Sequence, residues 1–132
     1  MRWRPFTWLR RRSRAEAKAP VGVVAWLALS VPGAVDPCAR FAVRAGVTTM
    51  GALSSSTIVL TQAGVSKRQA DLRVDADGAE VVDLGSTGGT SVNGARVTRR
   101  RLRDGDVIAF GVVRLRFEVI PGRHPALHRR RP

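Results

Sequence analysis

Two segments of this 132-residue chain carry side chains suited to binding an anion. The first is GVSKRQA, residues 64–70, which sets the hydroxyl of Ser66 beside the cations Lys67 and Arg68. The second is DLGSTGGTSVNG, residues 83–94, where glycines that allow a close approach to the backbone lie among three hydroxyls: Ser86, Thr87 and Thr90. Hydroxyl and backbone N–H donors together with a cation are what a phosphate dianion needs. The residues alone leave a plainer alternative open, in which Ser66 and Ser86 only cap turns.

Other chemistries find little support in the residue inventory. Both histidines, His124 and His128, follow the central part of the chain, so that part cannot hold a histidine-dependent catalytic triad. The GSTGG stretch lacks the Lys-Ser/Thr pair of a P-loop. Cys38 is alone, which excludes an internal disulfide or a cysteine-rich zinc site, and the histidines next to Pro125 have no thiol or carboxylate partner. We therefore expect no enzyme, no cofactor and no bound metal.

Positive charge is concentrated at the two ends of the chain. The formal net charge is +13, of which residues 1–20 hold +6, from seven basic residues and Glu16. Residues 121–132 hold +4, from four arginines, and the middle of the chain holds the remaining +3. We expect a domain at residues 21–121 between a basic, disordered tail at 1–20 and a basic tail at 122–132. As an alternative, such tails could contact nucleic acid or an anionic membrane, with Trp3, Phe6 and Trp8 stacking on bases or lying at the lipid interface.

The segments that must position the two loops have the patterns of β-strands. Residues 113–119 alternate between apolar and charged side chains, which is typical of a strand with one face in water. Turn pairs follow at intervals, at Asp77-Gly78, Asn93-Gly94 and Asp104-Gly105. Further short strands are predicted around and before these turns: residues 41–43, 47–50, 57–60, 70–74, 81–83, 90–92, 95–97 and 108–110. This succession predicts an all-β sandwich or barrel.

Residues 21–35, VGVVAWLALSVPGAV, form an apolar run behind the basic start of the chain. A secretory signal peptide has the same outline, but Pro32-Gly33 stands where a cleavage site needs small residues. The run is also shorter than the roughly 20 residues of a transmembrane helix. Its valine content and its Pro-Gly end favour a buried strand.

With both loops assembled, the chain resembles the forkhead-associated (FHA) domain. The resemblance is carried by four segments in the family's order and spacing: VSKRQA at 65–70, DLGSTGGTSVNG at 83–94, LRDGDVIAFG at 102–111 and LRF at 115–117. It implies a β-sandwich of two twisted, mostly antiparallel sheets with functional loops at one end. It also makes the run at 21–35 the first strand, so we expect a cytoplasmic rather than a secreted protein. The implied function is that of a monomeric signalling adaptor whose protein partner carries phosphothreonine.

The resemblance also assigns roles to individual positions. It implies that the phosphopeptide is bound by Ser66, Lys67, Arg68, Thr87 and Gly88. It implies structural turns at Gly51, Gly85, Gly89, Asn93 and Gly94. The family pattern has arginine, histidine and asparagine where this chain has Ala52, Gln69 and Gly88.

These departures predict a degenerate phosphate site. A charge-assisted hydrogen bond contributes about 1.5–3 kcal/mol, so the missing arginine at position 52 predicts a phosphate grip weaker by roughly tenfold to a hundredfold. Gly88 removes a polar contact to the peptide, whereas Gln69 keeps its capacity for hydrogen bonding. Three functions stay open: a weakened phosphothreonine reader, a scaffold that binds its partner without phosphate, and a passive sandwich whose tails bind nucleic acid or membrane.

Overall fold

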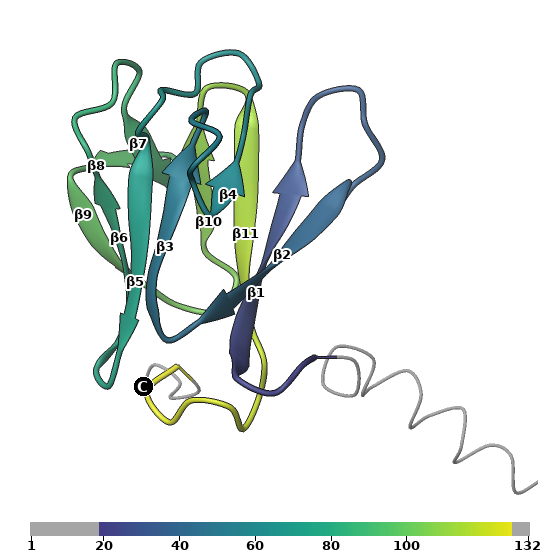
Figure 1. Cartoon of the computed structure of the whole chain (residues 1–132), viewed down its shortest axis with the longest axis vertical. Coiled ribbons are helices and arrows are strands. Elements are labelled where there is room, and N and C mark those ends of the chain that lie inside the picture. Colours follow the sequence, from purple (N-terminus) through teal and green to yellow (C-terminus); the bar gives the residue numbers. More distant parts are fainter. Residues whose placement is uncertain (1–18, 128–132) are drawn as a thin grey trace, which may run out of the picture.

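The computed structural model describes residues 19–127, which fold into two β-sheets packed face to face (Figure 1). The strands of this part of the chain are β1 (Val23–Ser30), β2 (Ala39–Arg44), β3 (Gly46–Gly51), β4 (Ile58–Val59), β5 (Ala70–Asp75), β6 (Gly78–Asp83), β7 (Thr90–Val92), β8 (Ala95–Val97), β9 (Arg99–Leu102), β10 (Val107–Phe110) and β11 (Val113–Val119). The first sheet has the order β2-β1-β11-β10-β7-β8, and the second has the order β4-β3-β5-β6-β9. Neighbouring strands pair antiparallel, except for the parallel pair β3 and β4. The predicted all-β sandwich is confirmed.

The apolar run at residues 21–35 supplies an inner strand of the first sheet. β1 lies between β2 and β11, with Leu27 opposite both Phe41 and Phe117. Val23 and Leu27 are completely buried. Removing this strand as a signal peptide would separate β2 from the rest of the first sheet, so the prediction of a buried strand is confirmed. Among residues 19–127 we find no helix long and apolar enough to cross a membrane.

The core lies between the sheets and is built by the period-two alternation of the strands. Along β11, Val113, Leu115 and Phe117 are completely buried, while the charged residues between them face outward. The side chains that oppose them from the second sheet include Leu72 and Val81, which are also completely buried. This core fixes the register of both sheets, because a slip by one residue would turn apolar side chains toward water.

Strand β9 is not predicted by the sequence pattern. Its residues are three consecutive arginines followed by Leu102, and only Leu102 is buried. β9 is an edge strand of the second sheet and pairs only with β6 among the described strands. Arg99 on β9 donates two hydrogen bonds to the Glu80 carboxylate on β6, at 3.0 and 3.1 Å. Three consecutive arginines show no alternation of apolar and polar residues, so the sequence does not predict a strand here. The strand forms because it pairs with β6.

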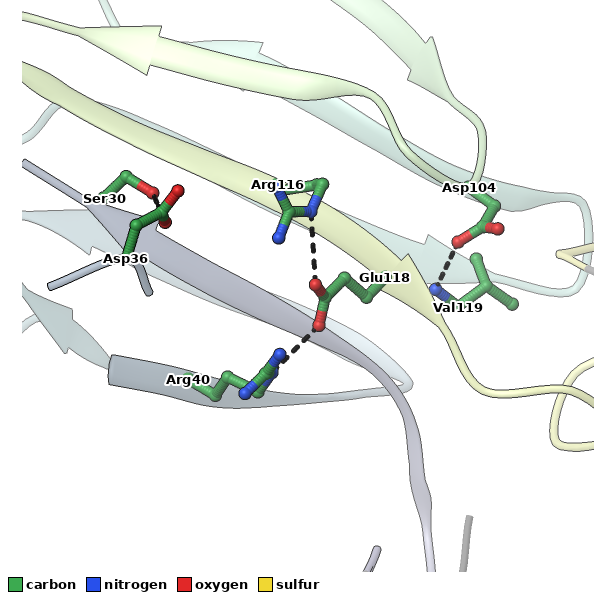
Figure 2. Close-up of polar contacts among 7 residues, drawn as sticks. All are labelled: Ser30, Asp36, Arg40, Asp104, Arg116, Glu118 and Val119. Carbon is green, nitrogen blue, oxygen red and sulfur yellow. Dashed lines mark hydrogen bonds and ion pairs between the residues drawn. The ribbon is translucent and has the colours of Figure 1, made fainter. Parts of the chain in front are cut away.

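A shared carboxylate holds the outer face of the first sheet together (Figure 2). Glu118 on β11 accepts a hydrogen bond from Arg40 on β2 at 3.0 Å and another from Arg116 at 3.2 Å. Ala28 on β1 lies in register between the two arginines and is nearly completely buried. The figure also shows two turn contacts of this region: Ser30 with Asp36, and the Val119 N–H donating to the Asp104 carboxylate at 2.8 Å.

The segment after β11 returns to the sandwich and packs against it. Arg123 donates hydrogen bonds to three carbonyl oxygens at the start of the described chain: Ala19, Pro20 and Val23, at 3.1, 2.9 and 2.8 Å. Leu127 is buried, and the His124 imidazole Nε2 bonds the Asp75 carbonyl oxygen at 2.8 Å. Residues 122–127, the first part of the expected basic tail at 122–132, thus contact the sandwich through side chains that find partners there.

The remaining predictions for the tails concern residues outside the described range. The predicted disorder of residues 1–20 falls almost entirely on residues 1–18, and so do Trp3, Phe6 and Trp8. His128 and the arginines at 129–131 also lie outside it. Contact of these tails with nucleic acid or membrane remains a hypothesis.

Candidate functional site

The loops singled out by their chemistry meet at one end of the sandwich, at the top in Figure 1. They are the segment after β3, the loop between β4 and β5, and the loop between β6 and β7. Loops lie at this end because β3, β4 and β6 all finish there, while β5 and β7 start there. Residues far apart in the sequence are thus placed side by side.

Position 52 is fixed next to Ser66 by backbone contacts. The Ala52 N–H donates to the Ser66 carbonyl oxygen at 3.0 Å, and the Leu53 N–H donates to the Lys67 carbonyl oxygen at 3.2 Å. Gly51 is predicted to form a turn but is the buried last residue of β3, where an added Cβ would overlap the Lys67 carbonyl oxygen. A glycine is required here for close approach of two backbones, and it sets Ala52 directly beside the hydroxyl loop.

Gln69 joins the two hydroxyl loops from beneath. Its side chain is completely buried, and its Oε1 accepts the Ser66 N–H at 2.8 Å. Its Nε2 donates to the Gly89 carbonyl oxygen and to Thr90 Oγ1, each at 3.1 Å. These three hydrogen bonds offset the free-energy cost of burying the amide, which would destabilise the fold if the amide had no partner. Gln69 therefore props both loops in one arrangement.

Asp83 organises the second loop. One of its carboxylate oxygens accepts the hydroxyls of Ser86 and Thr90 at 2.6 and 2.7 Å, and the other accepts the Gly85 N–H at 3.0 Å. Burial raises the pKa of Asp83, but these hydrogen bonds favour the ionised form and outweigh it, so that the pKa lies below its usual range. The Ser86 hydroxyl therefore donates within its own turn, as in the alternative in which Ser86 only caps a turn.

Backbone conformation explains the small residues of the second loop and of the hairpin that follows. Gly85, Gly89 and Gly94 have φ values of +75°, +85° and +88°, which glycine adopts without strain. Asn93 has φ +51°, and its amide bonds both Asp106 and the Val107 N–H, each at 2.9 Å. The β7–β8 turn is thereby tied to the start of β10.

The exposed edge of the site is formed by donors. Ser66 Oγ accepts the Thr87 N–H at 3.0 Å, which brings the two loops into direct contact. Lys67, Arg68, Thr87 and Gly88 are exposed beside this bond. Within residues 19–127, neither the Lys67 nor the Arg68 side chain has an ion-pair or hydrogen-bond partner. The structure therefore brings all five predicted phosphopeptide positions to one edge, with two hydroxyls and two uncommitted cations.

Among the described residues, no arginine that precedes position 52 takes the place of the arginine absent there. The nearest one along the chain, Arg44, donates instead to the Val21 carbonyl oxygen at 2.9 Å, just before β1. One cation next to the site is not predicted from the sequence: Arg96 on β8, whose guanidinium lies against Gly89. The Asn93-Gly94 turn could have revealed it, since a two-residue hairpin pairs position 91 with position 96.

Comparison with known proteins agrees with this geometry. Residues 48–111 match the family model of the FHA domain. A structure from a structural and functional analysis of phosphothreonine-dependent FHA domain interactions is 31% identical, with a TM-score of 0.64, and 73% of this chain covers 98% of that one. The FhaA FHA domain, solved in complex with the intracellular domain of Rv3910, is 32% identical, with a TM-score of 0.61, and 70% of this chain covers 99% of that one.

Full-length relatives match over a more limited share of their length. The oxoglutarate dehydrogenase inhibitor of Corynebacterium efficiens is 40% identical over 79 residues, which are 60% of this chain and 56% of that protein. The FHA domain-containing protein FhaA of Mycobacterium tuberculosis is 39% identical over 71 residues, or 54% of this chain and 14% of that protein. The chain thus spans about half or less of the length of these two relatives. Since it covers whole FHA domains of known structure at above 30% identity, this chain belongs to the FHA family of protein-interaction modules.

Proposed function

We propose that this chain binds a threonine-phosphorylated segment of a protein partner at the edge formed by Ser66, Lys67, Arg68 and Thr87. The observation that carries the proposal is the hydrogen bond from the Thr87 N–H to Ser66 Oγ. Because Ser66 uses its oxygen as an acceptor in that bond, its own hydroxyl proton stays available to a phosphate oxygen. The similarity to a domain studied for phosphothreonine-dependent interactions supports the same reading.

Charge supports an anionic ligand at this edge. Lys67 and Arg68 are exposed and have no carboxylate partner within residues 19–127. The one acidic residue of the second loop, Asp83, has its carboxylate occupied by donors from its own loop. An incoming phosphate therefore meets cations and hydroxyls without displacing an existing ion pair.

The phosphate grip is proposed to be weak. Ala52 lies beside Ser66, where an arginine would add a planar fork of N–H donors, and Lys67 cannot form such a fork. One charge-assisted hydrogen bond is worth about 1.5–3 kcal/mol, so binding should be weaker by roughly tenfold to a hundredfold than with arginine at this position.

The test is a titration of matched peptide pools that differ only in a fixed phosphothreonine or threonine. We expect the phosphorylated pool to bind more tightly, and Ala52→Arg to strengthen its binding by roughly tenfold to a hundredfold. Ser54→Arg is the matched control, because Ser54 is exposed in the same loop and receives the same charge. A gain as large for Ser54→Arg, or none for Ala52→Arg, would show that position 52 is not the missing anchor.

A second candidate function is binding of a partner without phosphate. It is favoured by the combination of Ala52 with Gly88, since Gly88 offers no side chain to hold a peptide backbone. An added Cβ at Gly88 would come no nearer than 3.7 Å to the Gly64 carbonyl oxygen, so space for a side chain exists and is unused. Equal affinity for the phosphorylated and unphosphorylated pools would favour this candidate over the first.

A further inference from the structure

A groove runs from the second hydroxyl loop onto the outer face of the first sheet. Its volume is about 250 Å³, and its lining includes Gly88, Gly89, Ser91, Arg96, Ala109 and Gly111. Gly88 belongs at the same time to the proposed phosphopeptide edge. The volume lies below the range of roughly 300–1,000 Å³ for small-molecule pockets, which suits one or two side chains rather than a cofactor.

Arg96 is the charged member of this groove. Its guanidinium packs against Gly89, where an added Cβ would lie 2.6 Å from Nε and 2.7 Å from Cζ. The glycine that gives the loop its positive φ thus also leaves the room that the arginine occupies. Arg96 is exposed and forms no ion pair or hydrogen bond through its side chain within residues 19–127. Arg40, Arg99 and Arg116, by contrast, are each paired with a glutamate.

The strand register extends this positive charge across the sheet. Ser91 pairs with Arg96 on one side and with Ala109 on the other, and Ala109 pairs in turn with Arg114. All four face outward, because the residues next to them along the strands, such as Val92 and Ile108, are completely buried. Two small side chains thus lie between two exposed arginines whose strands are about 14 Å apart, at about 4.8 Å per strand.

We propose that this groove binds a second anionic side chain of the same partner segment, with Arg96 as the residue that contacts it. The inference rests on the proposed function, since it places this side chain next to a phosphothreonine held at Ser66 and Thr87. Its support is charge complementarity: an unpaired guanidinium lies over a floor of small residues that leaves space for a carboxylate or a phosphate. Either group can accept two parallel N–H bonds from an arginine, so the shared chemistry is a pair of anionic oxygens on one central atom that faces the guanidinium.

The test uses phosphothreonine peptides that differ only in the residues flanking the phosphothreonine, which are glutamine, glutamate or phosphoserine. Binding is measured by fluorescence anisotropy at low and at high salt. We expect glutamate to bind about threefold to tenfold more tightly than glutamine, since the contact is partly exposed, and the preference to shrink with salt. The phosphoserine arm decides whether a second phosphate or a carboxylate is the better occupant.

Two arginine variants assign the effect to the groove. Arg96→Gln should abolish the preference for acidic flanks and weaken the glutamate-flanked peptide by more than the glutamine-flanked one. Arg100→Gln is the matched control, because Arg100 is also exposed and has no side-chain partner within residues 19–127, but lies on β9 of the other sheet. This variant should keep the preference.

Other results overturn the inference, the proposed function on which it rests, or both. Equal affinity for glutamine and glutamate flanks in the unaltered protein would remove the second subsite while leaving phosphothreonine binding intact. An equal loss of both peptides in Arg96→Gln would mean that Arg96 holds the threonine phosphate itself. If phosphothreonine has no effect at all, the proposed function fails, and backbone amide shifts decide the groove separately. An unphosphorylated glutamate peptide should then still shift the Ser91 and Ala109 amides, and absence of these shifts would overturn the groove as well.

Discussion

Gln69 offers the sharpest test of how the two loops are held together, through the substitution Gln69→Leu. The change keeps the approximate volume of the side chain and removes its three hydrogen bonds. The Ser66 N–H and the Gly89 carbonyl oxygen lose their partner, at about 1–2 kcal/mol each within the usual range for unsatisfied groups. Thr90 loses less, because its hydroxyl still donates to Asp83. The free energy of unfolding should therefore fall by about 3 kcal/mol.

The assay is urea unfolding followed by circular dichroism, with a drop in Tm on the order of 10–20 °C as a second readout. Gln62→Leu is the matched control, because the Gln62 Oε1 is buried without a hydrogen-bond partner among the described residues. The same substitution there removes no bond and should leave stability unchanged or slightly higher. Gln69→His should cost about 1 kcal/mol at most, since imidazole keeps one donor and one acceptor. A loss below about 1 kcal/mol for Gln69→Leu, or an equal loss for Gln62→Leu, would refute the role of Gln69 as a shared prop.

Four further substitutions test the loops and the outer face. The pKa of Asp83 is lowered in the folded state, so its carboxylate stabilises the fold above the unfolded-state pKa of about 3.9. This contribution is lost as the pH falls through the folded-state pKa. In Asp83→Asn, the free energy of unfolding measured with urea should therefore fall less steeply below about pH 5 than in the unaltered protein. Gly51→Ala should cost about 1–3 kcal/mol because its Cβ meets the Lys67 carbonyl, while Gly88→Ala should be neutral or stabilising by up to about 1 kcal/mol, as thermal melts would show. Glu118→Gln should lower stability by about 1 kcal/mol at low salt and by less at high salt, and a loss independent of salt would contradict an electrostatic role.

The sequence predicts most of the strands, because alternation and turn pairs are local patterns; that the two loops share one site follows only from the resemblance to the FHA domain. Alternation marks β11, and two-residue turns mark the hairpins around Asp77-Gly78 and Asn93-Gly94. The arginine run of β9 escapes prediction, since its strand conformation follows from pairing with β6 rather than from alternation. The ordered segment after β11 escapes for a related reason: the partners of Arg123 lie about a hundred residues earlier in the chain.

The candidate site shows the same division between local and long-range information. The types of the hydroxyl and cationic residues are visible in two short stretches of sequence. The sequence does not show which hydroxyls keep a free donor. The Ser86 hydroxyl donates to Asp83, whereas Ser66 Oγ accepts the N–H of Thr87, twenty-one residues away. Arg96 lies beside the loops only because a hairpin folds β8 back along β7. Contacts of this kind depend on tertiary structure, and residue types alone do not determine them.

Arg123 has a consequence for how this domain can be attached to other molecules. By binding the carbonyls of Ala19, Pro20 and Val23, it ties the segment after β11 to the start of the described chain, and both ends of the described chain lie at the bottom of Figure 1. The length of β5, roughly 17 Å at 3.3 Å per residue, separates this place from Gln69 beneath the loops. A bead, a dye or a fused protein joined before residue 19 or after residue 127 is thus anchored on the side away from the loops. Immobilisation by either route should present the loops outward, and a tether at one end should be interchangeable with a tether at the other.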